Sequence, residues 1–291
     1  MPSPTAAVVV CTRDRPVQLA RALAALRPQV ETVGFDLLVV DQSEVPYAGD
    51  DGVRAIADRG RGLSRARNVA LRATDTRWLA FIDDDCRPEP GWGPALAEVL
   101  AADPPAAVVC PPVVAGPLPA GDYVEVTTFP VDRTVLRRGR RVHPGRLGFG
   151  ACTVVRRDVA LALGGWDERL GPGAPHFPAA DDMDFNYRLL RAGHTALVTP
   201  GPRVVHEQWR TAAELPALHA GYLAAWCGFA CKHLRTGDAR GGLWLLTIAA
   251  VDVADMLASA IGHGSLLRLR IAVAKARGMV SGIARGLSRS W

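Results

Sequence analysis

The segment Trp78-Leu-Ala-Phe-Ile-Asp-Asp-Asp-Cys-Arg-Pro88 decides the fold of this 291-residue chain. Its first five residues are apolar and aromatic and predict a buried strand, which the prolines that follow prevent from continuing. Three carboxylates, Asp83, Asp84 and Asp85, therefore stand together where the strand gives way to a loop. Adjacent negative charges repel one another, so we expect a cation beside them. A divalent metal with oxygen ligands is the simplest candidate, and such a metal commonly shares its remaining positions with substrate phosphates.

Strand-like and helix-like patterns alternate through the first hundred residues. Apolar runs and helical periodicity predict, in chain order, a strand at 6–11, a helix at 17–26, a strand at 35–40, a helix at 63–73, a strand at 78–82 and a helix at 92–101. This order is typical of a mostly parallel central sheet covered by helices on both faces. In open sheets of that kind, ligands bind beyond the carboxyl ends of the strands. Asp14, Asp41 and Asp83–Asp85 all follow predicted strand ends, so we expect them to converge on one site.

The rest of the chain divides into a compact part and a helical part. After a stretch rich in proline and arginine at 103–148, the patterns predict strands at 108–114, 151–155 and 194–199 and helices at 158–163 and 182–191. From about residue 211 the pattern is helical to the end, with breaks near 237–242 and 262–264. We therefore predict an α/β domain at 1–210 and a helical region at 211–291.

Composition and charge exclude several classes of protein. Hydrophobic residues make up 49% of the chain, which is too many for a disordered protein. The six cysteines include no Cys-x-x-Cys pair, so we expect free thiols in a cytoplasmic protein rather than a zinc or disulfide framework. No signal peptide is expected, because the N-terminus lacks a basic segment followed by a long apolar run. A net charge of +5 favours anionic partners, but charge alone is a weak argument for nucleic acid.

The C-terminal region combines apolar and basic residues. Its longest apolar stretch, 243–261, contains Asp252 and Asp255, so we do not expect it to span a membrane. No acidic residue follows Asp255, whereas arginines and a lysine alternate with apolar residues from Leu266 onward. Such a helix could lie on an anionic membrane surface, which would make the protein peripheral on the inner face of the membrane. A packed helix that happens to be basic is an equal alternative.

Six motifs, in one order along the chain, resemble family 2 glycosyltransferases with the GT-A fold. They are Val8-Val-Val-Cys-Thr-Arg-Asp-Arg-Pro16, Leu37-Leu-Val-Val-Asp-Gln-Ser43, Gly62-Leu-Ser-Arg-Ala-Arg-Asn68, Phe81-Ile-Asp-Asp-Asp85, Gly164-Gly-Trp-Asp-Glu168 and Asp181-Asp-Met-Asp-Phe-Asn-Tyr-Arg-Leu189. The resemblance covers residues 6 to about 210. It implies a GT-A α/β fold, with a Rossmann-like, mostly parallel central sheet flanked by helices and followed by a helical C-terminal extension.

The resemblance implies an inverting, metal-dependent glycosyltransferase. Such an enzyme moves a sugar from a nucleoside diphosphate sugar to a hydroxyl or amine, and a metal neutralises the charge of the departing diphosphate. The implied cofactor is Mn²⁺ or Mg²⁺. UDP or dTDP is the first expectation for the nucleotide, with GDP behind them. The acceptor stays open between a glycan, a lipid-linked acceptor and a natural product, and no nucleic acid partner is expected.

The resemblance also assigns residues to the metal and the donor. Asp85 is the implied metal ligand, with Asp83 sharing the ion or reaching the ribose, and His206 is a further implied ligand. The implied nucleotide contacts are Thr12, Arg13, Asp14, Asp41, Arg65, Arg67, Asp83 and Asp84. Simpler roles stay open at this point. The aspartate triplet could be a solvated turn, Asp41 could cap its own loop, and His206 could be structural.

Attack by an acceptor hydroxyl requires a base, and the resemblance implies Asp182, with Asp181 beside it. Asp181 stands where the family carries glutamate, so which of the two acts as base stays open, and both could instead cap the following helix. The implied lining of the acceptor or sugar pocket is Trp166, Asp167 and Trp209. Packing is the alternative role for both tryptophans. The arginines of 133–146 could meet a diphosphate or an anionic acceptor, or form a solvated surface.

Two other classes of protein remain open. A sugar-nucleotide nucleotidyltransferase would share the sheet and the aspartates, but the loop at 11–16 contains no glycine. A non-catalytic nucleotide-sugar-binding GT-A protein is the second alternative, and the intact Asp83, Asp85 and Asp182 argue against it. A dehydrogenase is disfavoured because no Gly-x-Gly-x-x-Gly follows a predicted strand.

Overall fold

The computed structural model describes residues 5–288, and its backbone contacts divide the chain into two compact units. The sheet unit comprises the chain up to Ala120 together with Glu125–Glu168 and Asp182–Trp209. The helical unit comprises Gly121–Val124, Arg169–Asp181 and the chain from Arg210 on. The final boundary between the two units lies between Trp209 and Arg210, one residue before the predicted domain boundary. Two short segments of the predicted α/β domain, Gly121–Val124 and Arg169–Asp181, belong to the helical unit. The first four and last three residues of the predicted domains lie outside the described residues.

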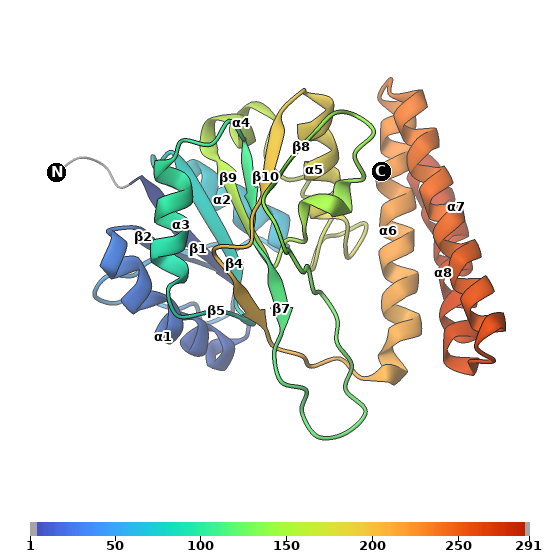
Figure 1. Cartoon of the computed structure of the whole chain (residues 1–291), viewed down its shortest axis with the longest axis horizontal. Coiled ribbons are helices and arrows are strands. Elements are labelled where there is room, and N and C mark those ends of the chain that lie inside the picture. Colours follow the sequence, from blue (N-terminus) through green and yellow to red (C-terminus); the bar gives the residue numbers. More distant parts are fainter. Residues whose placement is uncertain (1–4, 289–291) are drawn as a thin grey trace. The chain divides into compact units, whose positions relative to one another are not determined.

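An eight-stranded sheet forms the centre of the sheet unit (Figure 1). Its strands, in spatial order, are β3 (Arg54–Ala57), β2 (Asp36–Asp41), β1 (Ala6–Thr12), β4 (Trp78–Asp83), β9 (Cys152–Arg156), β6 (Val108–Cys110), β10 (Thr195–Val198) and β8 (Val135–Arg138). The first four strands run parallel, whereas β9 runs antiparallel to both β4 and β6. The carboxyl ends of β1, β2 and β4 therefore meet at one edge of the sheet.

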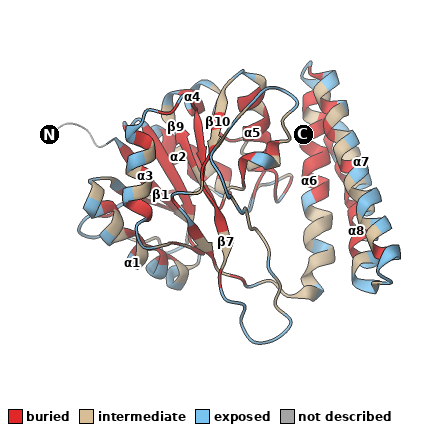
Figure 2. Cartoon of the chain, in the orientation of Figure 1, coloured by how far each residue is buried: buried red, intermediate tan, exposed pale blue. Residues whose placement is uncertain are grey.

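Helices cover both faces of this sheet. Helices α1 (Pro16–Val33) and α3 (Trp92–Ala101) share a core with Val8 and Val10 of β1. Helices α2 (Leu63–Ala73), α4 (Arg157–Ala162) and α5 (Asp181–Arg191) pack on the opposite face, where Val9 points. Alternate residues of one strand thus enter opposite layers, as strand geometry requires. Figure 2 shows the central strands buried along most of their length.

A second, three-stranded sheet continues from the aspartate segment. Its strands are β5 (Cys86–Pro88), β11 (Val204–His206) and β7 (Val113–Ala115), with β11 in the middle. The run at 108–114, predicted as one strand, is divided by Pro111 and Pro112, so that β6 joins the central sheet and β7 the small one. In the small sheet His206 lies opposite Cys86. This pairing brings a histidine from late in the chain to the aspartates.

Three long helices, α6 (Leu215–Arg235), α7 (Ala239–Gly262) and α8 (Leu266–Leu287), form most of the helical unit. Helix α8 approaches α6 through glycines spaced four residues apart. A Cβ atom at Gly278 would lie 2.3 Å from the Ala220 carbonyl oxygen, and one at Gly282 would lie 2.3 Å from that of Ala224. The two backbones are therefore in direct contact, and only glycine fits at these positions.

Helix α7 is long and apolar enough to cross a membrane, judged by length and composition alone. Its most apolar window has a mean hydropathy of 1.7, and 17% of that window is buried. This finding differs from the sequence expectation, which rested on Asp252 and Asp255. Asp252 does not stand alone, because Lys275 of α8 donates to it at 2.8 Å. The pair neutralises one of the two charges on which that expectation depended.

We predict that Gly282→Ala lowers the free energy of unfolding by about 1–3 kcal/mol, because the added methyl group overpacks the contact between α6 and α8. Thermal or denaturant unfolding measures the change. Gly262→Ala is the matched control, since that glycine lies in α7 with nothing within 4 Å of an added Cβ. Equal stability of the two variants would contradict the close packing described.

Candidate functional site

The carboxyl ends of β1, β2 and β4 bring the predicted site residues together. Thr12 ends β1 beside Asp41 of β2, and Asp83 ends β4 beside Cys11 of β1. The Thr12 hydroxyl donates a hydrogen bond of 2.6 Å to Oδ2 of Asp84. These three strand ends therefore converge, as their order in the sequence predicts.

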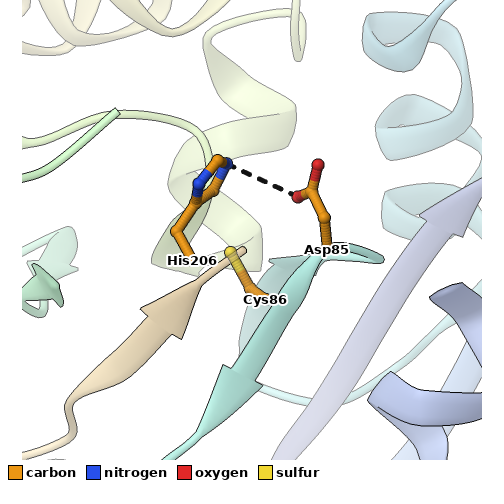
Figure 3. Close-up of side chains that lie close together, drawn as sticks. All are labelled: Asp85, Cys86 and His206. Carbon is orange, nitrogen blue, oxygen red and sulfur yellow. Dashed lines mark ion pairs between the residues drawn. The ribbon is translucent and has the colours of Figure 1, made fainter. Parts of the chain in front are cut away.

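Asp85 and His206 are turned toward each other, as Figure 3 shows. Oδ1 of Asp85 lies 3.6 Å from Nε2 of His206, and both side chains are more than nine-tenths buried. The backbone N–H of Glu207 donates to the Asp85 carbonyl at 2.8 Å. The side-chain amide nitrogen of Gln208 lies 3.2 Å from Nδ1 of His206 and donates to the carbonyl of that histidine. Pairing of β5 with β11 and these bonds hold the two side chains in place.

Asp85, Cys86 and His206 have potential metal-ligand atoms within 4.8 Å of one another. In the part of the chain that the structure describes, these three residues form the candidate metal-binding cluster. Burial lowers the pKa of His206, so its imidazole is neutral at neutral pH and offers a lone pair. Burial raises the pKa of Cys86 well above its usual value, so the thiol stays protonated. The donors that remain are a carboxylate oxygen and an imidazole nitrogen, a set that fits a divalent cation.

Arg15 compensates the charge of the neighbouring carboxylates. Its Nη1 lies 2.7 Å from Oδ1 of Asp84, and its Nη2 lies 3.1 Å from Oδ2 of Asp85. Trp209 donates its indole N–H to the same Oδ2 at 3.1 Å, and the Arg15 guanidinium lies over the indole ring. Burial raises the pKa of Asp84 to about 6, against the opposing effects of Thr12 and Arg15. No role was assigned to Arg15 from the sequence, so its pairing with the aspartates was missed.

Asp83 pairs with Arg67 and does not join the Asp85–His206 group. Nη2 of Arg67 lies 3.3 Å from Oδ1 of Asp83 and donates to the Gly150 carbonyl at 2.8 Å. The Arg67 side chain is 1% exposed, and its guanidinium lies over the ring of Trp166. Trp166 is itself 2% exposed and stacks on Phe185. Its ring therefore lies in the core and supports Arg67, as the packing alternative predicts, and does not line an open pocket.

Asp182 joins the same network from the first turn of α5. One of its oxygens accepts the Gly150 N–H at 2.9 Å, and the other accepts the next backbone N–H of the helix at 2.7 Å. Gly150 thus links Asp182 to Arg67, because Arg67 binds the carbonyl of the same glycine. Asp181 is 5% exposed, and its carboxyl group lies against Gly171. Of the two aspartates, Asp182 is the more accessible.

Asp41 organises its own loop. Its Oδ1 accepts the N–H and the hydroxyl of Ser43, and its Oδ2 accepts the Tyr47 N–H at 2.8 Å. These bonds form the loop cap that was the alternative to nucleotide contact. Arg13 and Asp14 lie beside this loop, since the Asp14 N–H donates to the Ser43 hydroxyl at 2.7 Å. Both are exposed and pair with each other at 3.2 Å, so they are open to a ligand.

Arg65 is held by Asp58, which sequence reasoning missed. Nε and Nη2 of Arg65 both bind the Asp58 carboxylate at 3.0 Å, and Gln42 donates to it at 2.8 Å. Asp58 follows β3, whose residues are half-buried or exposed and lack the apolar run that marks a strand. The signal that identified Asp41 was therefore absent.

Asn68 fixes the turn at 164–168. Its side-chain amide donates to the Trp166 carbonyl at 2.8 Å, and its side-chain oxygen accepts the Trp166 N–H at 2.8 Å. Gly165 has a φ of 70°, and an added Cβ there would lie 2.3 Å from the Asn68 oxygen. Asp167, one of the predicted pocket residues, is half-buried in this turn.

Comparison with protein families gives one match over more than half of the chain. The sequence model of the family described as glycosyl transferase family 2 matches residues 7–164. The chain is 28% identical over 240 residues to a pre-mycofactocin glycosyltransferase of Mycobacterium tuberculosis, which covers 78% of this chain and 47% of the relative. It is 26% identical over 242 residues to the galactofuranosyltransferase GlfT2 of that organism, covering 70% and 37%. The chain thus spans about half, or less, of the length of these relatives.

Solved structures share the fold. A mannosyltransferase, PcManGT from Pyrobaculum calidifontis, in complex with GDP-Man and Mn²⁺, aligns with a TM-score of 0.57 at 16% identity, covering 97% of this chain and 87% of that one. GalNAc-T7 with UDP, GalNAc and Mn²⁺ aligns with a TM-score of 0.51 at 15% identity, covering 72% and 45%. The predicted GT-A α/β fold is confirmed by these alignments.

We predict that Asn68→Ala lowers the free energy of unfolding by about 1–3 kcal/mol, because it leaves the buried N–H and C=O of Trp166 without partners. Denaturant unfolding measures the loss. A change below about 0.5 kcal/mol, the range of neutral surface substitutions, would show that the turn does not depend on this side chain.

Proposed function

The chain belongs to glycosyl transferase family 2, and on that premise we propose that it transfers a sugar from a nucleoside diphosphate sugar to an acceptor hydroxyl or amine with inversion. Two observations support the proposal: Asp85 faces His206, and a hydrogen-bonded chain connects Asp83 to Asp182. The candidate cation site and the candidate base thus involve neighbouring aspartates of one triplet, Asp85 for the cation and Asp83 for the chain that leads to Asp182.

Asp85 and His206 would hold the divalent cation. When bound, the ion would neutralise the charge that develops on the departing diphosphate. The imidazole nitrogen favours Mn²⁺ over Mg²⁺, because Mg²⁺ is held almost entirely by oxygen ligands. Mn²⁺ in the two structural neighbours agrees with this choice.

The nucleotide would bind where β1 and β2 end. Arg13 and Asp14 are exposed there and can reach a base or a ribose, while Asp41 shapes the loop through its hydrogen bonds. Arg67 would act indirectly, since its buried guanidinium pairs with Asp83, whereas Arg65 is partly exposed beside Asp58 and would contact the nucleotide. UDP and dTDP remain the first donors to test, and GDP the next.

Asp182 would be the base. Two N–H groups orient its carboxylate, and the N-terminal end of α5 stabilises its negative charge. In an inverting transfer the acceptor hydroxyl attacks the anomeric carbon on the face opposite the leaving diphosphate, and its proton passes to the carboxylate. The C–O bond to the acceptor forms as the bond between the anomeric carbon and the diphosphate breaks.

The helical unit would rest on an anionic membrane surface. Large apolar side chains are exposed on α7 and α8: Leu243, Val251, Leu257, Ile261, Leu266, Leu267, Leu269, Val273, Val280 and Leu287. Arg270 and Arg277 are exposed among those of α8. The exposed apolar side chains can enter the acyl region of a membrane, and the arginines among them can pair with anionic lipid headgroups. This placement favours a lipid-linked acceptor and a location at the inner face of the membrane.

Asp182→Asn is expected to retain nucleoside diphosphate binding and to reduce sugar transfer about 10²–10⁴-fold, because the amide cannot accept the acceptor proton. Titration calorimetry measures binding. Turnover is measured as the release of nucleoside diphosphate from a panel of UDP, dTDP and GDP sugars. Each donor is incubated with candidate acceptors, or with water alone as the acceptor. An unchanged rate would place the base elsewhere.

Two results for the wild-type protein would favour the alternative functions. Release of pyrophosphate from a nucleoside triphosphate would favour a nucleotidyltransferase, and donor binding without turnover would favour a non-catalytic protein.

Replacing Arg270 and Arg277 together by glutamate is expected to weaken binding to phosphatidylserine-containing vesicles about thirtyfold or more, since each arginine contributes about 1 kcal/mol. Vesicle sedimentation measures the change. The control replaces Arg72 and Arg77, exposed arginines of the sheet unit, by glutamate. An equal loss of vesicle binding in both variants would contradict the membrane assignment. So would a dimer of the wild-type protein in light scattering that the Arg270 and Arg277 variant abolishes and the control variant retains.

A further inference from the structure

Arg15 occupies one side of the Asp85 carboxylate and leaves the other side to His206. Oδ2 of Asp85 accepts from both Arg15 and Trp209, each at 3.1 Å, whereas Oδ1 faces the imidazole at 3.6 Å. The guanidinium also binds Asp84 at 2.7 Å. It therefore lies within a few ångströms of the position that a cation between Asp85 and His206 would take.

Formal charges describe how this arrangement responds to a cation. Asp84 and Asp85 carry two negative charges, and Arg15 reduces the net charge of the three groups to −1. Asp83 does not change this balance, because Arg67 compensates it. A divalent cation would raise the net charge of the group to +1, and it would lie beside a guanidinium in a largely buried environment where repulsion is strong. A bound diphosphate would return the group to a negative net charge.

We infer that Arg15 makes cation binding depend on the diphosphate. With no nucleotide, the guanidinium compensates the carboxylates and lowers the affinity of the pocket for a divalent cation. With a nucleoside diphosphate present, the phosphates offset both the cation and Arg15, so the two ligands bind cooperatively. The inference rests on the proposed function, since it takes Asp85 and His206 as the cation site.

The contacts of Arg15 leave its side chain less enclosed than that of Arg67. Its side chain is one-third exposed, in contrast to the fully buried Arg67. Within residues 5–288, the guanidinium is held by two carboxylates and an indole ring and donates to no backbone carbonyl. Arg67, by comparison, also binds the Gly150 carbonyl. A shift of Arg15 toward an incoming phosphate would therefore leave no backbone group without a partner.

The test is Mn²⁺ titration calorimetry on the full chain, with and without UDP. Arg15→Gln is expected to raise the affinity for Mn²⁺ alone about tenfold and to reduce the enhancement that UDP gives by a similar factor. Arg15→Lys keeps the charge and is expected to behave like the wild type. Arg77→Gln, which removes an equal charge at the opposite end of β4, is expected to leave the Mn²⁺ affinity unchanged.

The outcomes separate this inference from the proposed function. Unchanged or weaker Mn²⁺ binding by Arg15→Gln, or a gain shared by Arg77→Gln, would overturn the role of Arg15 and leave the function standing. No Mn²⁺ binding by any form, with or without UDP, GDP or dTDP, would overturn the cation site itself. If Arg15→Gln does not fold, the double variant Arg15→Gln with Asp84→Asn restores the net charge of −1. It is expected to match the wild-type Mn²⁺ affinity, and a tenfold departure would overturn the inference.

Discussion

Three carboxylates at the end of a buried strand need compensating positive charge, and the site depends on how this chain supplies it. Two arginines do so, and they divide the triplet between them. Arg67 neutralises Asp83 from α2, and Arg15 neutralises Asp84 and Asp85 from the start of α1. Arg15 reaches the triplet because parallel pairing of β1 with β4 brings the segment after β1 beside the end of β4, whereas Arg67 reaches Asp83 from α2. Without that register, the negative charges would repel one another in a region that excludes water.

The two arginines have different consequences for chemistry. Arg67 is enclosed by Trp166, and it continues through Gly150 to Asp182, so the carboxylate proposed as base is held by the same rigid network that orients Asp83. Arg15 is partly exposed and lies beside the carboxylate that faces His206. The rigid half of the site thus positions groups, and the adjustable half responds to the charge of incoming ligands.

Much of the sheet unit could be predicted from the sequence, because its central strands are continuous apolar runs and its helices have clear periodicity. Helices α2 and α3 begin and end at the predicted residues. Strands β3, β5 and β8 could not be found in this way, since they are short or half-exposed and derive their pairing from neighbours distant in sequence. The glycine contact between α8 and α6 could not be predicted, because a four-residue glycine spacing gives no hydrophobic signal.

Candidate site residues could be predicted from the sequence where they follow the end of a predicted strand. The residues that they contact in the fold could not be predicted. Thr12 binds Asp84 and His206 faces Asp85, but the sequence suggested a metal as the cation where the protein also uses Arg15. That pairing joins positions about seventy residues apart, and no local pattern reveals it. Trp166 shows the same limit, because a tryptophan in a polar turn looks like a ligand-stacking residue until its neighbours Phe81 and Phe185 are seen around it.

The most direct test of the proposed cation site is anomalous diffraction at the manganese edge from crystals grown with Mn²⁺ and UDP. We expect a peak within bonding distance of both the Asp85 carboxylate and Nε2 of His206, with the diphosphate completing the coordination of the ion. A manganese ion bound by Asp83 instead, or a diphosphate bound away from the ends of β1 and β4, would contradict the proposed site.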